Sequence, residues 1–134
     1  MDLSLSEEQQ AFVRTARDFL EREAKPHRRE WDRAESIDLG FVRRMGEQGF
    51  FGLGIPEEYG GIGGDLLTYA LATEELGRAD SSLRGLVSVS LGLAGKSILA
   101  YGPEEQKQRW LPIITAGESL ACFGLTEPDT GSDA

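Results

Sequence analysis

Residues 122–133 read Cys122-Phe123-Gly124-Leu125-Thr126-Glu127-Pro128-Asp129-Thr130-Gly131-Ser132-Asp133, and no other stretch of the chain is as informative. The apolar run 119–123 that leads into it predicts a buried strand. The chain then changes to hydroxyl groups, carboxylates, a proline and a glycine, which are typical of a loop. Backbone N–H groups and hydroxyls at the end of a strand can point at one ligand. We therefore expect a binding loop here.

The preceding sequence predicts an all-α domain of about six helices, from N-cap residues and apolar spacing. Ser6 begins the first helix with Gln9 in the capping-box position, and Pro26 ends it near residue 24. We expect further helices over 38–48, 65–78, from about 80–82 to 94, and from about 103 through at least 114, with a separate helical turn over 97–101. Gly95 divides that turn from the helix before it, and Pro112 interrupts or restarts the last helix. The charged segment 27–34 is expected on the surface, anchored by Trp31.

A glycine-rich stretch, 52–64, separates the second and third of these helices. So many glycines exclude a regular helix and favour an ordered connection whose turns need positive φ. The stretch lacks the Gly-Lys-Ser/Thr ending of a phosphate-binding Walker loop, and it does not fit a dinucleotide-binding fingerprint. We interpret it as structural.

Composition narrows the classes of function. The net charge is −9, with 14 basic and 23 acidic residues, which argues against nucleic acid or an anionic membrane as partner. The single cysteine, Cys122, excludes an internal disulfide and is expected to pack inside the strand as a small apolar residue. One histidine and one cysteine cannot form a metal cluster or a Ser-His-Asp triad. No apolar run reaches the length of a bilayer span and no signal segment opens the chain, so we expect a cytoplasmic protein.

The stretch 122–133 resembles the flavin-and-substrate signature of the acyl-CoA dehydrogenases, and the segment 55–61 resembles a structural loop of the same family. The resemblance covers essentially the whole chain and implies two parts. Residues 1–117 would be the N-terminal helical domain, and residues 118–134 would begin a β domain with its first strand. Because the sequence stops inside the signature, we expect a fragment of a longer enzyme rather than a natural truncation.

The resemblance also implies a flavin site that uses FAD. Phe123, Leu125 and Thr126 would line the isoalloxazine ring through backbone groups and the threonine hydroxyl. Gly131 and Ser132 would approach the flavin pyrophosphate and the acyl-CoA, with Ser132 also contacting the substrate. No catalytic residue is assigned in this chain, because the family's carboxylate base comes from a later helical domain.

Arg84 is a second candidate, for binding substrate. It is the only basic residue between Arg78 and Lys96 on a predicted apolar helix, where a guanidinium needs a carboxylate or phosphate partner. The segment 80–89 resembles the glutaryl-CoA dehydrogenase branch, in which the matching arginine holds the far carboxylate of a dicarboxylic acyl chain. Gly85 stands where that branch has a serine.

Two hypotheses follow. In the first, the chain is the N-terminal portion of an FAD-dependent dehydrogenase that desaturates an acyl thioester between its α and β carbons and is inactive alone. The resemblance then implies an acyl-CoA or acyl carrier protein thioester as substrate, electron-transfer flavoprotein as acceptor, and a homo-oligomer, as a homotetramer, when full length. In the second, the chain is an autonomous helical module that binds another protein and carries no flavin.

Overall fold

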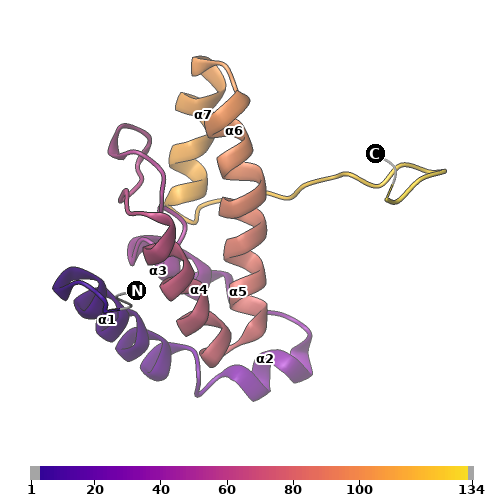
Figure 1. The fold of residues 1–134 in the computed structure, drawn as a ribbon. Coiled ribbons are helices and arrows are strands. Elements are labelled where there is room, and N and C mark those ends of the chain that lie inside the picture. Colours follow the sequence, from indigo (N-terminus) through magenta and orange to yellow (C-terminus); the bar gives the residue numbers. More distant parts are fainter. Residues whose placement is uncertain (1–3, 133–134) are drawn as a thin grey trace.

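The structure is a computed structural model of the 134-residue chain, and it describes residues 4–132. Asp133, the last residue of the signature, and Ala134 lie outside the described residues. The helices occupy one body, from which the C-terminal segment runs out into the open (Figure 1). Their bounds are α1 (Glu7–Glu23), α2 (Arg28–Ala34), α3 (Leu39–Glu47), the 3₁₀-helix η1 (Glu57–Tyr59), α4 (Leu66–Ala79), α5 (Ser81–Val87), the π-helix η2 (Ser88–Gly95), α6 (Lys96–Tyr101) and α7 (Glu104–Thr115).

The predicted helix starts are confirmed. Ser6 and Gln9 form the reciprocal capping box of α1, with Gln9 N–H donating to Ser6 Oγ at 3.1 Å. The side chains of Asp38, Asp65 and Asp80 cap α3, α4 and α5. Each carboxylate accepts from backbone N–H groups that the first helical turn leaves without a partner.

Segment 27–34 contains a helix that the sequence analysis did not predict, α2. Its anchor is Trp31, which is buried and packs its ring 5.0 Å from that of Phe41 in α3. Phe41 in turn stacks on Phe19 of α1 at 5.8 Å. These three aromatic rings join α1, α2 and α3 into one core.

The glycine-rich connection is ordered, as predicted. Leu53 and Gly63 form an isolated bridge, and Gly54 N–H donates to Gly63 O at 2.6 Å. A Cβ at Gly61 would collide with the backbone of Ile55, so close backbone approach requires glycine there. Gly60 has φ 78° where η1 ends.

The elements α5, η2 and α6 form one continuous helical run, Ser81–Tyr101 (Figure 1). The predicted break at Gly95 is wrong. The backbone there keeps the helical angles φ −60° and ψ −48°, and the π-helical turns of η2 continue directly into α6. The run has 21 residues, and an 18-residue window of it has a mean hydropathy of 1.3, so by length and composition it could cross a membrane, contrary to the sequence analysis. A core helix of a globular protein can be equally long and apolar, and a third of this 18-residue window is buried.

Helix α7 runs through Pro112, so the predicted interruption is also wrong. A proline in a helix removes one backbone N–H, but the helix continues beyond it. Ala116 N–H and Thr115 Oγ1 both donate to the carbonyl of Pro112, at 3.1 Å each.

The buried strand predicted over 119–123 is absent, and no strand forms anywhere between residues 4 and 132. A strand needs a neighbour to satisfy its backbone, and the described chain offers none beside this segment. Leu120, Phe123 and Leu125 are 40%, 50% and 52% exposed, and Cys122 is exposed rather than packed. The rest of the fold-class prediction, an all-α domain, is confirmed.

Candidate functional site

The C-terminal segment leaves the helical body at a defined place. After α7 the chain turns at Gly117, which has φ 67° and lies against Gly46 of α3. Glu118 and Ser119 then donate their N–H groups to Ile113 O at 3.1 and 3.4 Å. These contacts fix the direction in which the following residues run.

The five residues predicted to bind the cofactor all lie on the projecting part. Phe123, Leu125, Thr126, Gly131 and Ser132 are exposed. Within the described chain the backbone of residues 122–126 makes no hydrogen bond, and the next one closes a turn from Glu127 N–H to Thr130 O at 3.0 Å. The segment therefore presents a row of free donors and acceptors, with a threonine hydroxyl at its end.

An apolar recess lies where this segment passes the long helical run. Gly85 and Leu86 of α5, Val89 of η2 and residues 120–122 line it, and its volume is about 340 Å³. The sequence analysis singled out neither Leu86 nor Val89. Their three-residue spacing places both side chains on one face of the helix.

Arg84 directly precedes Gly85, the first residue of the recess lining, in sequence, and its side chain is exposed. Among the described residues its guanidinium has no hydrogen bond and no ion pair. Its stem passes Gly77 of α4, where a Cβ would come within 3.9 Å of Arg84 Cδ. Burial raises the pKa of the nearby Tyr69 phenol, and the positive charge of Arg84 opposes that rise. The structure places Arg84 near Gly77 and Tyr69 of α4, outside the set of residues that line the recess, and no contact joins it to the five cofactor candidates.

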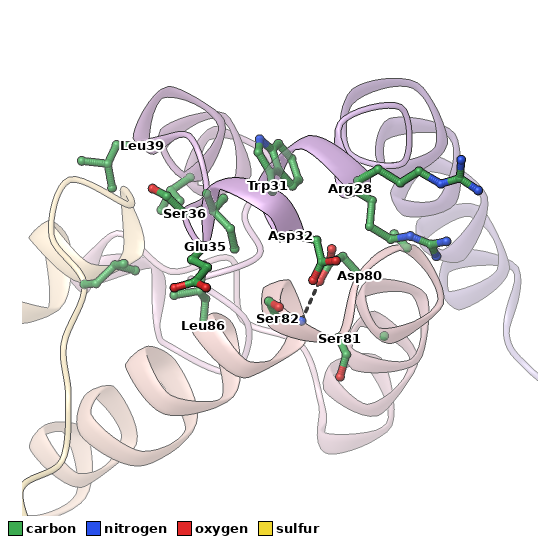
Figure 2. A pocket seen from close by; sticks show the side chains of 16 residues that line it. Arg28, Trp31, Asp32, Glu35, Ser36, Leu39, Asp80, Ser81, Ser82 and Leu86 are labelled. Atoms are coloured by element: carbon green, nitrogen blue, oxygen red, sulfur yellow. Dashed lines mark hydrogen bonds between the residues drawn. The ribbon is translucent and has the colours of Figure 1, made fainter.

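A larger open cavity, of about 960 Å³, lies between α2, the start of α3 and the junction of α4 with α5. Figure 2 shows Trp31 on one side of it and Asp80, whose carboxylate accepts from Ser82 N–H at 2.8 Å, on another. Leu86 and Leu120 line both this cavity and the recess, so the two hollows adjoin. No group of acidic, histidine or cysteine side chains suited to a metal occurs in residues 4–132.

The sequence profile described as "Acyl-CoA dehydrogenase, N-terminal domain" matches residues 6–118. The chain belongs to the acyl-CoA dehydrogenase family. The matched range covers all the helices and ends where the projecting segment begins.

Two relatives show how much of a family member the chain represents. The short-chain-specific acyl-CoA dehydrogenase of Clostridium acetobutylicum is 38% identical over 134 residues, which are 100% of this chain and 35% of that protein. The human mitochondrial short-chain-specific enzyme is 39% identical over 132 residues, which are 98% of this chain and 32% of that protein. The chain spans about a third of the length of the curated relatives it matches.

Solved structures agree in fold. One, described as electron transferring flavoprotein of Acidaminococcus fermentans, is 42% identical with a TM-score of 0.93, covering 99% of this chain and 35% of that one. Another, a glutaryl-CoA dehydrogenase from Mycobacterium smegmatis in complex with FADH2, is 38% identical with a TM-score of 0.90, covering 96% of this chain and 33% of that one. The second shows a flavin bound to a protein that contains this fold.

Proposed function

We propose that this chain is the N-terminal portion of an FAD-dependent acyl-CoA dehydrogenase that desaturates an acyl thioester between its α and β carbons. Residues 1–117 form its helical domain, and residues 118–134 begin the β domain. One observation carries the proposal beyond family membership. The signature segment is presented away from the body with the backbone of residues 122–126 unpaired, and it begins at Cys122, which lines an apolar recess.

The residues of the segment suit a flavin. A flavin ring offers carbonyl oxygens and ring nitrogens along one edge, and the free N–H groups on one side of residues 123–126, with the Thr126 hydroxyl, supply matching donors. At Gly131 a Cβ would meet nothing within 4 Å, so the backbone there is open to a bulky phosphate group, and Ser132 adds a donor. When bound, FAD supplies the acceptor for the β-hydride. In this proposal Phe123, Leu125, Thr126, Gly131 and Ser132 hold it, with Ser132 also near the thioester.

The recess suits an acyl chain. Its lining is almost wholly apolar, and its volume is at the lower end of the range for small-molecule pockets, about 300–1,000 Å³. Arg84 directly precedes Gly85 of this lining in sequence, and it has no acidic partner in the described chain. An unpaired guanidinium there favours a substrate with a distal carboxylate, such as a glutaryl-like thioester.

The remaining features of the proposal come from the family. The α-proton is removed by a carboxylate outside this chain, so residues 1–134 alone have no turnover. The substrate is a thioester of coenzyme A or of acyl carrier protein, and the similarity to a structure described as electron transferring flavoprotein supports that class of protein as acceptor. We propose a cytoplasmic homo-oligomer that binds neither nucleic acid nor membrane.

Flavin content and turnover of the intact enzyme test the proposal. Thr126→Val and Ser132→Ala each remove a hydroxyl from the segment, so we expect weaker FAD or substrate binding with the helical fold unchanged. Each lost hydrogen bond is worth about 0.5–1.5 kcal/mol, or roughly two- to tenfold in affinity. Ser119→Ala is the matched control, because Ser119 is exposed before the signature begins. Unchanged flavin content and turnover in both variants would contradict the assignment of these residues.

The second hypothesis, a helical interaction module without flavin, draws on the exposed apolar side chains Leu120, Phe123 and Leu125. Such side chains can also serve a protein interface. Colour separates the two hypotheses. An intact enzyme that purifies yellow with flavin absorption supports the dehydrogenase, whereas a colourless one that binds a protein partner supports the module.

A further inference from the structure

The projecting segment is held by the helical body as far as one residue and no further. Ala121 N–H donates to Ser90 Oγ at 3.0 Å, two residues after the bond from Ser119 to Ile113. Beyond Ala121, no hydrogen bond to the body occurs in the described part of the segment. Ala121 is therefore the last fixed point before the signature.

The acceptor of this bond is itself fixed. Ser90 is 1% exposed and lies in the π-helix η2, where Lys96 N–H donates five residues back to Leu91 O. Helical turns of this kind are rare and often accompany functional sites. A buried hydroxyl needs a polar partner, and a backbone N–H from outside the helix supplies one. Ser90 thus joins the long helical run to the chain that leaves it.

The bond between Ala121 and Ser90 selects one register of the projecting segment, that is, which of its residues face the body. In an extended backbone, N–H groups two residues apart point to the same edge. The bond from Ala121 turns its N–H toward the body, so an extended backbone beyond it has the N–H groups of Cys122, Gly124 and Thr126 on one edge and those of Phe123 and Leu125 on the other. A slip by one residue would exchange the two edges, and it would move Thr126 by about 3.3 Å along the segment. Hydrogen bonds to a ligand tolerate only a few tenths of an ångström.

We propose that Ser90 is a positioning residue, whose bond to Ala121 sets the register of the signature segment and so places its donors against the cofactor. The placement of the segment follows from the structure alone. The consequence for the cofactor rests on the proposed function.

Amide exchange in the ¹⁵N-labelled 134-residue chain tests the first part. Ser90→Ala should speed exchange of the Ala121 amide by about two- to tenfold, the effect of one hydrogen bond, and should increase motion over 122–126. Ser88→Ala is the matched control, since that hydroxyl donates within its own helix to Gly85 O at 3.2 Å and should leave Ala121 unchanged. Ala121→Pro removes the donor without touching the helix and should loosen the segment equally. Unchanged motion over 122–126 in both Ser90→Ala and Ala121→Pro would overturn the proposal.

The intact flavoprotein tests the second part. Ser90→Ala should shift the visible flavin spectrum and weaken FAD binding about two- to tenfold, whereas Ser88→Ala should do neither. A loosened segment with an unchanged spectrum and unchanged FAD affinity would overturn the role toward the cofactor. If the unmutated enzyme bound no FAD, the proposed function would fail, while the exchange measurement would still decide whether Ser90 sets the register.

Discussion

At the scale of single residues, one ion pair joins α1 to α4 through a buried carboxylate. Arg17 Nε and Nη2 donate to the two carboxylate oxygens of Glu75 at 2.9 and 2.7 Å, and Arg78 lies 3.8 Å away. Glu75 is 4% exposed, whereas the side chain of Arg17 is 43% exposed. Burial opposes ionisation, but the hydrogen bonds from Arg17 prevail and lower the pKa of Glu75.

Glu75→Gln should therefore destabilise the chain. The amide fills the same space but loses the charge-assisted bonds, which are worth about 1.5–3 kcal/mol when shielded and less here because Arg17 meets solvent. We expect the free energy of unfolding to fall by about 1–2 kcal/mol in denaturant titrations at pH 7. Glu74→Gln is the control, because its neighbouring carboxylate is exposed and should change stability little.

The same pair predicts a dependence on pH. The pKa of Glu75 in the folded chain is below its ordinary value of 4.5, so its contribution is complete above that value and is lost as pH falls through the lowered pKa. The difference in unfolding free energy between the unmutated chain and Glu75→Gln should be constant near neutral pH and shrink below about pH 4.5. A difference that persisted unchanged to the acid limit would show that Glu75 acts through packing rather than charge.

Arg84 allows a prediction about substrate. In the intact enzyme, Arg84→Met should lower kcat/KM for glutaryl-like thioesters by roughly ten- to a hundredfold, because a charge-assisted bond is worth about 1.5–3 kcal/mol. Straight-chain monocarboxylic thioesters lack the distal carboxylate and should be turned over as before. Equal losses on both classes would assign Arg84 to the fold, and no activity of the unmutated enzyme on dicarboxylic thioesters would remove the hypothesis.

At the scale of elements, the sequence predicted the starts of helices better than their interruptions. The start of a helix depends on one capping side chain beside it in the sequence. At α4 this is Asp65, whose carboxylate accepts from Thr68 N–H at 2.7 Å. Whether a glycine or a proline interrupts a helix depends on what surrounds that residue. Gly95 is buried where the long run packs on α7, and Pro112 lies where η1 meets α7, so tertiary packing overrides the local preference of both residues.

The junction between α3 and the turn after α7 offers a test at this scale. A Cβ at Gly46 would collide with the backbone carbonyl of Ala116, which cannot move without shifting α7 or the segment that follows. Gly46→Ala should cost about 1–3 kcal/mol of unfolding free energy, as overpacking does elsewhere. Gly77→Ala is the matched control, because its Cβ meets only Arg84 Cδ at 3.9 Å and should stabilise α4 by about 0.5–1 kcal/mol. Equal effects of the two changes, measured by thermal unfolding, would contradict close packing at Gly46.

At the scale of the whole molecule, the chain consists of a packed helical body and a segment that the body holds only at its base (Figure 1). The residues of that segment could be singled out from the sequence, because their order is distinctive. The conformation of these residues could not be predicted, because a strand forms only beside another stretch of chain with which it can pair. The recess was missed for a related reason: Leu86 and Leu120 are far apart in sequence, and only folding brings them to one wall.

The division into a helical body and a projecting segment predicts how the isolated chain binds FAD. Residues 123–132 offer a few exposed hydrogen-bonding groups and no enclosing walls, and each bond contributes only about 0.5–1.5 kcal/mol. That sum does not offset the loss of translational and rotational freedom on binding, about 4 kcal/mol or more. Purified residues 1–134 should therefore be colourless and retain little or no FAD in equilibrium dialysis, whereas the intact enzyme should retain it. Micromolar FAD binding by the isolated chain would mean that the helical body itself, through the cavity beside Trp31 or the recess beside Leu86, supplies the walls that we assign to the rest of the enzyme.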